Sequence, residues 1–250
     1  MTRLIKTPCL PSGVVLNCLI GECYTEEIKE LTERGIECIT LKKNPLLEEE
    51  ISVHADILSF NFGNGQVLLN KNSIGENELK KSGIAPIYYN NQIGSPYPND
   101  ITLNVAYNGR HIICNSKYTA KEIIEFADIN NIKIINTKQG YSKCNLCILN
   151  DQAVITEDSA LACLLKNYQY DVLLISTGDI YLSDIHYGFL GGASCKLSED
   201  EMYFSGDLSS HKDFERIIEF LDLYNIKPIY NKTRRLTDFG GIIQLTEKTV

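Results

Sequence analysis

Apolar runs, polar turns and one amphipathic segment follow each other in an order that recurs along the chain. In the clearest copy, a stretch of apolar and small polar residues from Lys143 to Leu149 ends at the turn pair Asn150-Asp151, and an apolar run follows from Ala153 to Thr156, which predicts a β-hairpin. Helix-start residues at 156–159 precede apolar residues at helical spacing, and residues 171–175 form a last short apolar run. The pattern predicts strand, tight turn, strand, helix, strand.

The same unit is found three more times, in residues 56–89, 100–136 and 193–230. The turn pairs Asn64-Gly65 and Asn108-Gly109 mark the hairpins of the first two copies, and a helix is expected after Asn70 in the first. Aligned on their turns, the units recur with a period of about 44 residues, which is typical of repeat arrays and propellers.

A fifth unit has to be assembled from both ends of the chain. Near the N-terminus, a strand Val14–Leu19, a helix Thr25–Glu33 and a strand Ile36–Leu41 lack a first strand, and the apolar run Gly241–Thr246 near the C-terminus can supply it. Joining the two ends removes exposed sheet edges. We therefore predict a single α/β domain, residues 1–250, built as a five-bladed propeller of strand-strand-helix-strand units. The alternative is one open sheet of alternating strands and helices.

Composition narrows the class of protein. The chain has 250 residues and a net charge of −8 with both signs interspersed, which is the opposite of a nucleic-acid-binding footprint. Its apolar stretches are too short for a membrane span or a signal peptide, so we expect a cytoplasmic protein that binds neither nucleic acid nor membrane. The nine cysteines are expected to be reduced thiols, since the count is odd.

The sequence predicts neither a cofactor nor a metal site. Cys144 and Cys147 form a lone Cys-x-x-Cys pair, and in an extended strand residues three apart face opposite sides. A phosphate-binding glycine loop is not recognisable either. Five further cysteines are interpreted as small packed hydrophobes: Cys9, Cys18, Cys38, Cys114 and Cys163.

Polar residues in the first strand of each unit are the candidates for function, because these strands would line the axis of the ring. Such residues are costly in apolar strands unless they are paired or solvated, so either a ligand at the centre or mutual hydrogen bonding would account for them. The candidates are His54, Asp56, Ser59, Asp100, Thr102, Asn104, Ser142, Cys144, Asn145, Ser194, Cys195 and Gln244.

Two long connections, residues 90–98 and 177–192, each precede a first strand. In a ring both would lie over the same mouth, and long connections on a rigid scaffold often carry function. The simpler interpretation is that each only spans a wider gap between units.

A ring of five such units with His54-Ala55-Asp56 opening one inner strand and Gly191-Gly192-Ala193-Ser194-Cys195 opening another resembles the pentein superfamily. This superfamily includes arginine deiminase, dimethylarginine dimethylaminohydrolase, agmatine deiminase and the amidinotransferases. The resemblance implies a cysteine thiolate that attacks a guanidinium carbon, a histidine that moves protons, and carboxylates that hold a small cationic substrate. His54, Cys144 and Cys195 are then the candidate catalytic residues. Those expected to bind the substrate are Asp56, Asp100, Asn104, Ser194 and Gln244.

The chain also departs from the pentein pattern. The superfamily carries its nucleophile on the closing C-terminal strand, where this chain has Gln244, which cannot attack carbon. The interval that separates histidine and cysteine in the superfamily leads from His54 to Cys144, and Cys195 is the rival nucleophile. Two interpretations stay open: an amidinohydrolase or amidinotransferase with a displaced cysteine, and a non-catalytic ring that binds a small molecule or has a structural role. The oligomeric state is left open.

Overall fold

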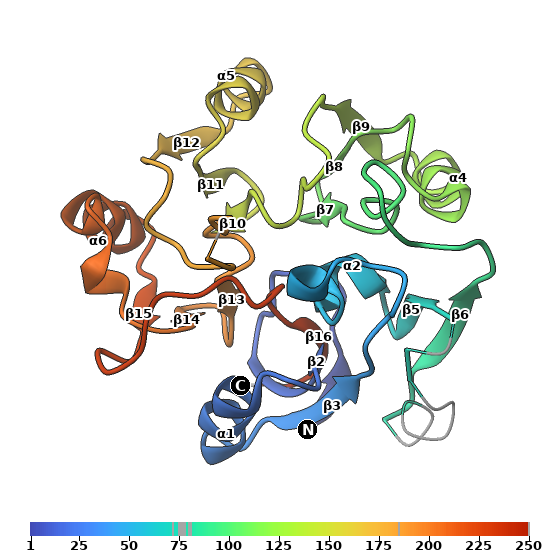
Figure 1. The fold of residues 1–250 in the computed structure, drawn as a ribbon, viewed down its shortest axis with the longest axis horizontal. Helices are drawn as coiled ribbons and strands as arrows, with labels where there is room; N and C mark the ends of the chain where they lie inside the picture. The colour runs from blue at the N-terminus through green and yellow to red at the C-terminus, as the bar shows by residue number, and fades with distance from the viewer. Residues whose placement is uncertain (72, 75–78, 80–81, 185, 250) are drawn as a thin grey trace.

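The chain was analysed as a computed structural model that describes residues 1–71, 73–74, 79, 82–184 and 186–249. Within these residues the strands form five separate small sheets, and Figure 1 shows the sheets arranged around a central region with the longer helices on the outside. The alternative of one open sheet is therefore wrong. The five sheets contain, in spatial order, β1 (Thr2–Leu4), β16 (Ile243–Lys248), β2 (Val14–Gly21) and β3 (Glu37–Leu41); β4 (Ser59–Gly63), β5 (Gln66–Asn70) and β6 (Ala85–Tyr89); β7 (Ala106–Tyr107), β8 (His111–Cys114) and β9 (Lys133–Asn136); β10 (Cys147–Ile148), β11 (Ala153–Thr156) and β12 (Asp171–Leu174); and β13 (Ser194–Lys196), β14 (Glu201–Phe204) and β15 (Lys227–Ile229).

Each three-stranded sheet has the order that the sequence predicts. The first two strands pair antiparallel across a tight turn, and the third pairs parallel to the second. A parallel pair requires a crossover connection, and in three of these sheets a helix provides it. The helix expected after Asn70 lies largely outside the described residues. The helical segments are α1 (Thr25–Glu33), α2 (Ala55–Leu58), α4 (Lys121–Ile129), α5 (Ser159–Asn167) and α6 (Phe214–Leu223), with the 3-10 turns η1 (Glu49–Ile51) and η2 (Leu208–Ser210).

The two ends of the chain share one sheet, as predicted. β16 pairs antiparallel with β2, with Ile243 opposite Leu19. The strand β1 was missed by the sequence analysis; it pairs with the other edge of β16, with Thr2 opposite Lys248. β16 is therefore an interior strand, held on both sides by the N-terminal segment.

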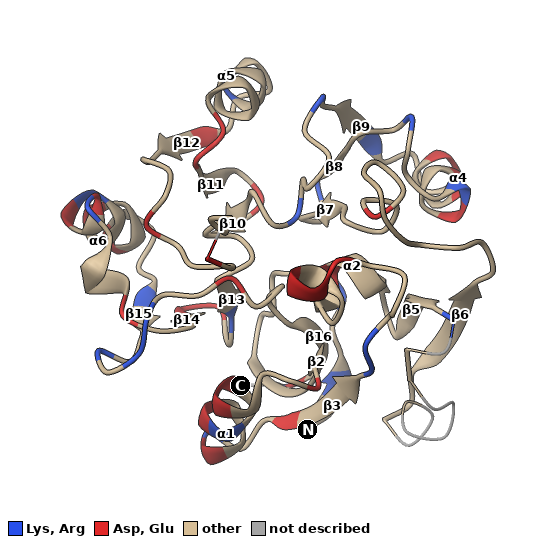
Figure 2. Cartoon of the chain, in the orientation of Figure 1, with Lys and Arg blue, Asp and Glu red and all other residues tan. Residues whose placement is uncertain are grey.

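The outer helices are amphipathic and bury one stripe each against their sheet. In α6 the buried residues are Ile217 and Leu221, four positions apart, and in α4 they are Ile123 and Ala127, which is one face of a helix. Charged residues occupy the remaining faces, as Figure 2 shows for α1, α4 and α6. Burial of the apolar stripes is the main force that holds each helix in place.

The first strand of most units is shorter than the sequence predicts. Asp56 lies in the one-turn helix α2, while Asp100–Asn104 and Ser142–Asn145 lie in turns that precede β7 and β10. The turns close through backbone hydrogen bonds such as Asn104 N to Ile101 O and Asn145 N to Tyr141 O. Alternating polar and apolar residues fit such turns as well as they fit a strand, so local pattern could not separate the two.

All nine cysteines lie in the described part of the chain and are free thiols. The prediction that Cys163 is packed inside is wrong, because α5 turns Leu161, Ala162 and Leu165 inward and leaves Cys163 exposed. Cys9 and Cys38 are only partly buried. Among the described residues, the helices are all too short or too polar to cross a bilayer.

Candidate functional site

His54 and Asp56 are placed by the short helix α2. His54 precedes the helix in an extended conformation, and its carbonyl accepts hydrogen bonds from the backbone N–H groups of Ile57 and Leu58. The hydroxyl of Ser59 donates to the carbonyl of Ala55 at 2.6 Å and ends the helix. The single turn of α2 thus positions the side chains of His54 and Asp56, which are two positions apart in the sequence, and both are buried.

Cys144 lies in the turn before β10, and Asn104 holds that turn. The side-chain oxygen of Asn104 accepts from the backbone N–H groups of Lys143 at 2.8 Å and of Cys144 at 3.3 Å. Its amide nitrogen donates to Cys144 Sγ at 3.0 Å and to the carbonyl of Asp56 at 3.2 Å. Asn104 therefore positions the cysteine turn against α2 rather than facing an open channel.

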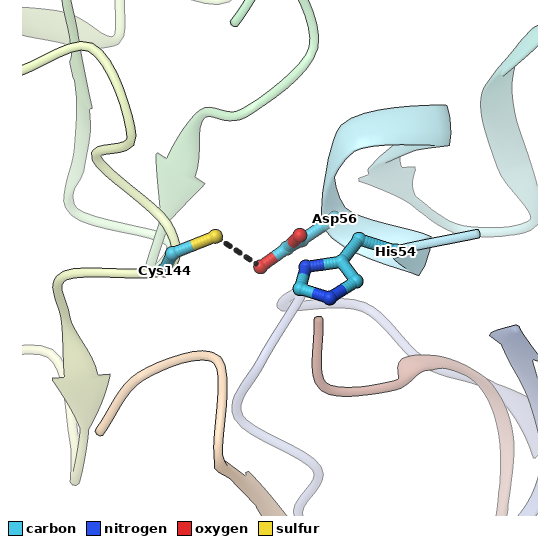
Figure 3. Close-up of side chains that lie close together, drawn as sticks. All are labelled: His54, Asp56 and Cys144. Carbon is cyan, nitrogen blue, oxygen red and sulfur yellow. Dashed lines mark hydrogen bonds between the residues drawn. The ribbon is translucent and has the colours of Figure 1, made fainter. Parts of the chain in front are cut away.

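His54, Asp56 and Cys144 point toward one another (Figure 3). Cys144 Sγ lies 3.0 Å from Asp56 Oδ2, so the thiol donates a hydrogen bond to the carboxylate. Neither ring nitrogen of His54 has a hydrogen-bond partner among the described residues, and the same is true of Asp56 Oδ1. Buried polar atoms without partners are uncommon and point to a functional site.

A second carboxylate, Asp238, completes the cluster from the segment between β15 and β16. Asp238 Oδ1 lies 3.8 Å from His54 Nδ1. The carboxylate accepts backbone hydrogen bonds from Gly240 and from Phe189, both at 3.0 Å. These two N–H groups fix the carboxylate beside the imidazole, which is the arrangement that orients a histidine in many active sites.

The charges of this cluster act on each other strongly because the side chains are buried. Burial raises the pKa of Asp56 to about 6, while His54 and Lys143 oppose the shift and Asp238 adds to it. Burial and the carboxylates of Asp56 and Asp238 hold the pKa of the Cys144 thiol well above its usual range. The thiol is therefore protonated at neutral pH, and a positive charge placed between the carboxylates would lower its pKa.

A pocket of about 440 Å³ leads from the surface to this cluster. His54, Cys144 and Asp238 line it, and Asp100 and Tyr141 lie on its wall. Asp100 Oδ2 accepts a hydrogen bond from the Tyr141 hydroxyl. Glu48 and Glu50 also line the pocket; Figure 2 shows the acidic coil of η1 near the middle of the molecule.

Both long connections contribute to the pocket. Tyr97, from residues 90–98, and Leu182, His186, Tyr187 and Phe189, from residues 177–192, line it. Both connections therefore line the same pocket, and the interpretation that they only span gaps does not account for these contacts.

The other predicted site residues lie elsewhere along the centre. Cys195, Ser194 and Gln244 line a small separate cavity of about 10 Å³, and Gln244 donates to the carbonyl of Lys196 at 3.1 Å. Burial raises the pKa of Cys195, and the structure does not bring this thiol to the pocket that His54 lines. Asp56 and Asp100, both expected to bind the substrate, are both buried, and the like charge that adds to the raised pKa of Asp56 comes from Asp238.

Two members of the cluster were missed by sequence reasoning. Asp238 stands just before the closing strand, at a place comparable to Asp56 and Asp100, and that shared position could have identified it. Lys143, buried next to Cys144, donates to the carbonyl of Gly191 at 3.3 Å; a lysine in a turn is normally exposed, so the sequence carries no signal for it.

Solved structures with similar folds are enzymes that act on guanidino groups. An amidinotransferase of the saxitoxin biosynthetic pathway from Microseira wollei matches with a TM-score of 0.54 and 12% identity, covering 94% of this chain and 96% of the other. Agmatine deiminase from C. jejuni gives 0.56 and 12%, covering 92% and 90%. Inosamine-phosphate amidinotransferase from Streptomyces griseus gives 0.56 and 9%, covering 99% and 98%. The chain shares the fold of these enzymes, so the resemblance that the sequence predicted is confirmed at the level of the fold.

No curated protein matches the chain in sequence. The model of a protein family, described as a family of unknown function (DUF6873), matches residues 19–243. That match spans most of the chain, from β2 to the start of β16. The protein therefore belongs to the DUF6873 family, a family of unknown function.

Proposed function

We propose that this protein is an amidinohydrolase or amidinotransferase that acts on a small guanidino or amidino compound, with Cys144 as its nucleophile. The observation that supports this proposal is the buried cluster of a thiol, an imidazole and two carboxylates, in which Cys144, His54 and Asp238 line a pocket of about 440 Å³. A guanidinium is planar and cationic, and it suits carboxylate partners. The acidic wall of the pocket favours the same class of ligand.

The proposed chemistry begins with a protonated thiol. A cationic amidino group bound near Asp56 and Asp238 offsets their charges, so the pKa of Cys144 falls when the substrate binds. Cys144 then transfers its proton to His54, and its sulfur forms a bond to the amidino carbon. The bond from that carbon to the leaving nitrogen breaks as His54 gives the proton to this nitrogen. Attack by water, or by an acceptor amine, breaks the carbon–sulfur bond and restores the thiol.

We also propose that the five sheets are blades of a propeller that the two ends of the chain close. The shared sheet of β1, β16 and β2 supports this arrangement.

We also propose that the protein is cytoplasmic. The composition and the nine free thiols support this location.

A turnover assay tests the proposal directly. The purified protein is incubated with arginine, methylated arginines, agmatine and a peptidyl-arginine, and ureido product and ammonia are measured. We expect at least one substrate to be converted, with activity abolished in Cys144→Ser and His54→Ala. Cys195→Ser is the matched control, because Cys195 is also a buried thiol near the centre but lies outside the pocket; its activity should be retained.

Thiol labelling tests the site without a known substrate. A haloacetamidine carries a cationic amidine, so it should alkylate Cys144 faster than iodoacetamide does, whereas the exposed Cys23 and Cys163 should show no such preference. Equal rates for the two reagents at Cys144, together with no turnover, would favour the alternative: a non-catalytic ring that binds a small molecule or has a structural role.

A further inference from the structure

The three side chains in Figure 3 have the donor atoms of a metal site. One donor atom from each of His54, Asp56 and Cys144 lies within 4.8 Å of the other two, and all three residues are buried. Imidazole nitrogen, carboxylate oxygen and thiolate sulfur are the ligands that Zn²⁺ takes in proteins. With bond lengths of about 2.0–2.3 Å, the ligands of a tetrahedral zinc site lie roughly 3–4 Å apart, so small side-chain rotations suffice.

The donors also have unused bonding capacity. Among the described residues, both ring nitrogens of His54 and Asp56 Oδ1 lack hydrogen-bond partners. An unpaired buried polar atom costs about 1–3 kcal/mol, and an ion is one of the few ligands that fits between such atoms without a large cavity. This observation is independent of the spacing of the three donors.

The charge balance favours a cation at the same point. Asp56 and Asp238 place two carboxylates next to the thiol, and both carboxylates are buried. Lys143 is a buried cation close to Asp56 and Cys144, but its ammonium group donates to the carbonyl of Gly191 instead of to either carboxylate. One ammonium cannot neutralise two carboxylates and a thiolate, whereas an additional divalent ion can.

We propose that His54, Asp56 and Cys144 bind one Zn²⁺ ion, whose fourth position faces the pocket. Binding replaces the thiol proton: the S–H bond breaks, the proton passes to solvent, and a sulfur–zinc bond forms. Asn104, which donates to Cys144 Sγ at 3.0 Å, holds the sulfur ligand in place, as hydrogen-bonding partners of zinc ligands commonly do.

Sequence spacing gave no sign of this site, because its ligands are not a compact motif. Cys144 comes from a turn 88 positions after Asp56 in the chain, whereas recognisable zinc motifs bring their ligands close together in sequence. The proposal does not rest on the amidino chemistry, but the two compete for one sulfur: a zinc-bound Cys144 is not a free nucleophile.

Cobalt substitution is the primary test. Metal-free protein is titrated with Co²⁺ and then with Zn²⁺. We expect one equivalent of Co²⁺ to produce thiolate-to-cobalt charge-transfer absorption and Zn²⁺ to displace it. Cys144→Ser should abolish that absorption, and Asn104→Ala should weaken metal affinity by roughly 10–100-fold. Cys195→Ser should bind as the unchanged protein does.

A second measurement needs no variant. Zn²⁺ should slow alkylation of Cys144 in the unchanged protein and leave Cys23 and Cys163 unaffected. The proposal is overturned if Co²⁺ gives no thiolate band and Zn²⁺ does not protect Cys144. It is also overturned if the band survives Cys144→Ser but is lost in Cys38→Ser, since Cys18 and Cys38, with sulfurs 3.9 Å apart, would then be the metal ligands. Substrate turnover by a protein that binds no zinc would leave the proposed function standing and remove the metal site.

Discussion

At the scale of single residues, the reactivity of Cys144 depends on Asp56. The Asp56 carboxylate raises the pKa of the Cys144 thiol both by its charge and by accepting the thiol hydrogen bond. Asp56→Asn removes the charge, so the pKa of Cys144 should fall and its alkylation should begin at lower pH. The midpoint of the alkylation rate against pH, followed by peptide mapping, measures this.

Asp100→Asn is the matched control for that experiment. Asp100 lines the same pocket, but its carboxylate accepts a hydrogen bond from Tyr141, whereas the Cys144 thiol donates to Asp56. The midpoint should therefore stay unchanged. Equal shifts in the two variants would show that general pocket charge, and not contact with Asp56, controls the thiol.

Gly192 makes room for Asp238. A Cβ atom at Gly192 would lie 2.1 Å from Asp238 Oδ1, far inside contact distance, so Gly192→Ala should displace the carboxylate and destabilise the fold by about 1–3 kcal/mol. Urea denaturation measures the loss. In an Asp238→Ala background the same alanine should cost clearly less, because the clash is gone; an equal cost in both backgrounds would place the strain elsewhere.

Sequence reasoning named two residues of the candidate cluster, His54 and Cys144, and missed Asp238 for a physical reason. His54 and Cys144 follow from a resemblance to the pentein superfamily and its interval between catalytic residues. Asp238 could not be paired with His54 in advance, because their contact depends on how the segment before β16 packs on α2. Gly191 and Gly192 were interpreted as the setting of a nucleophilic Cys195, whereas a Cβ atom at Gly192 would clash with Asp238.

At the scale of elements, Glu157 links the start of α5 to the connection 177–192. The sequence pattern predicts a helix-start residue, and Asp158 does cap α5 by accepting from Leu161 N at 2.8 Å. Glu157 instead turns inward and accepts from Leu190 N at 2.9 Å. Burial raises the pKa of Glu157 to about 8. This carboxyl is therefore protonated through most of the neutral range.

The raised pKa makes a prediction about stability and pH. Because the pKa of Glu157 is higher in the folded than in the unfolded protein, its contribution is most favourable below about pH 4.5 and is lost as the pH rises toward 8. Glu157→Gln does not ionise, so between pH 5 and pH 9 it should gain on the order of 3 kcal/mol relative to the unchanged protein. Urea denaturation at both pH values measures the difference. A difference that is the same at pH 5 and pH 9 would contradict the prediction.

The hairpins could be predicted from the sequence because their signal is local. The turns that precede the short strands β7 and β10 could not. Asn64-Gly65 and Asn108-Gly109 place Asn64, Gly65 and Gly109 at positive φ, as tight turns require. The lengths of the first strands depend instead on contacts between units: Asn104 bonds to the backbone of Lys143 and Cys144 in the next unit. No window of the sequence contains both partners.

At the scale of the whole molecule, one strand holds the two ends together. β16 lies between β1 and β2, and the buried carboxylate of Glu247 accepts from Arg3 Nε at 2.7 Å and from the backbone N–H groups of Ser12 and Gly13. Thr249 N donates to the carbonyl of Met1 at 3.0 Å. The two ends are therefore adjacent in space, and they share the sheet that Figure 1 shows beside both termini.

This adjacency predicts that a circular permutant will fold. A short linker joins residue 250 to Met1, and new ends are placed between the exposed Lys232 and Thr233; every strand and every member of the His54 cluster is kept. Domains whose ends lie close together tolerate such permutation. We expect a cooperative thermal transition and unchanged preference of haloacetamidine for Cys144.

A truncated chain is the matched comparison. Deleting residues 243–249 keeps the chain order but removes the buried Ile243 and Leu245. Loss of each side chain costs about 2–5 kcal/mol, which is a large part of the roughly 5–15 kcal/mol that stabilises a domain. The truncated chain should lose the transition by circular dichroism. If it instead unfolds cooperatively like the permutant, the proposed closure through β16 is not needed, and contacts between adjacent sheets are sufficient to hold the five sheets together.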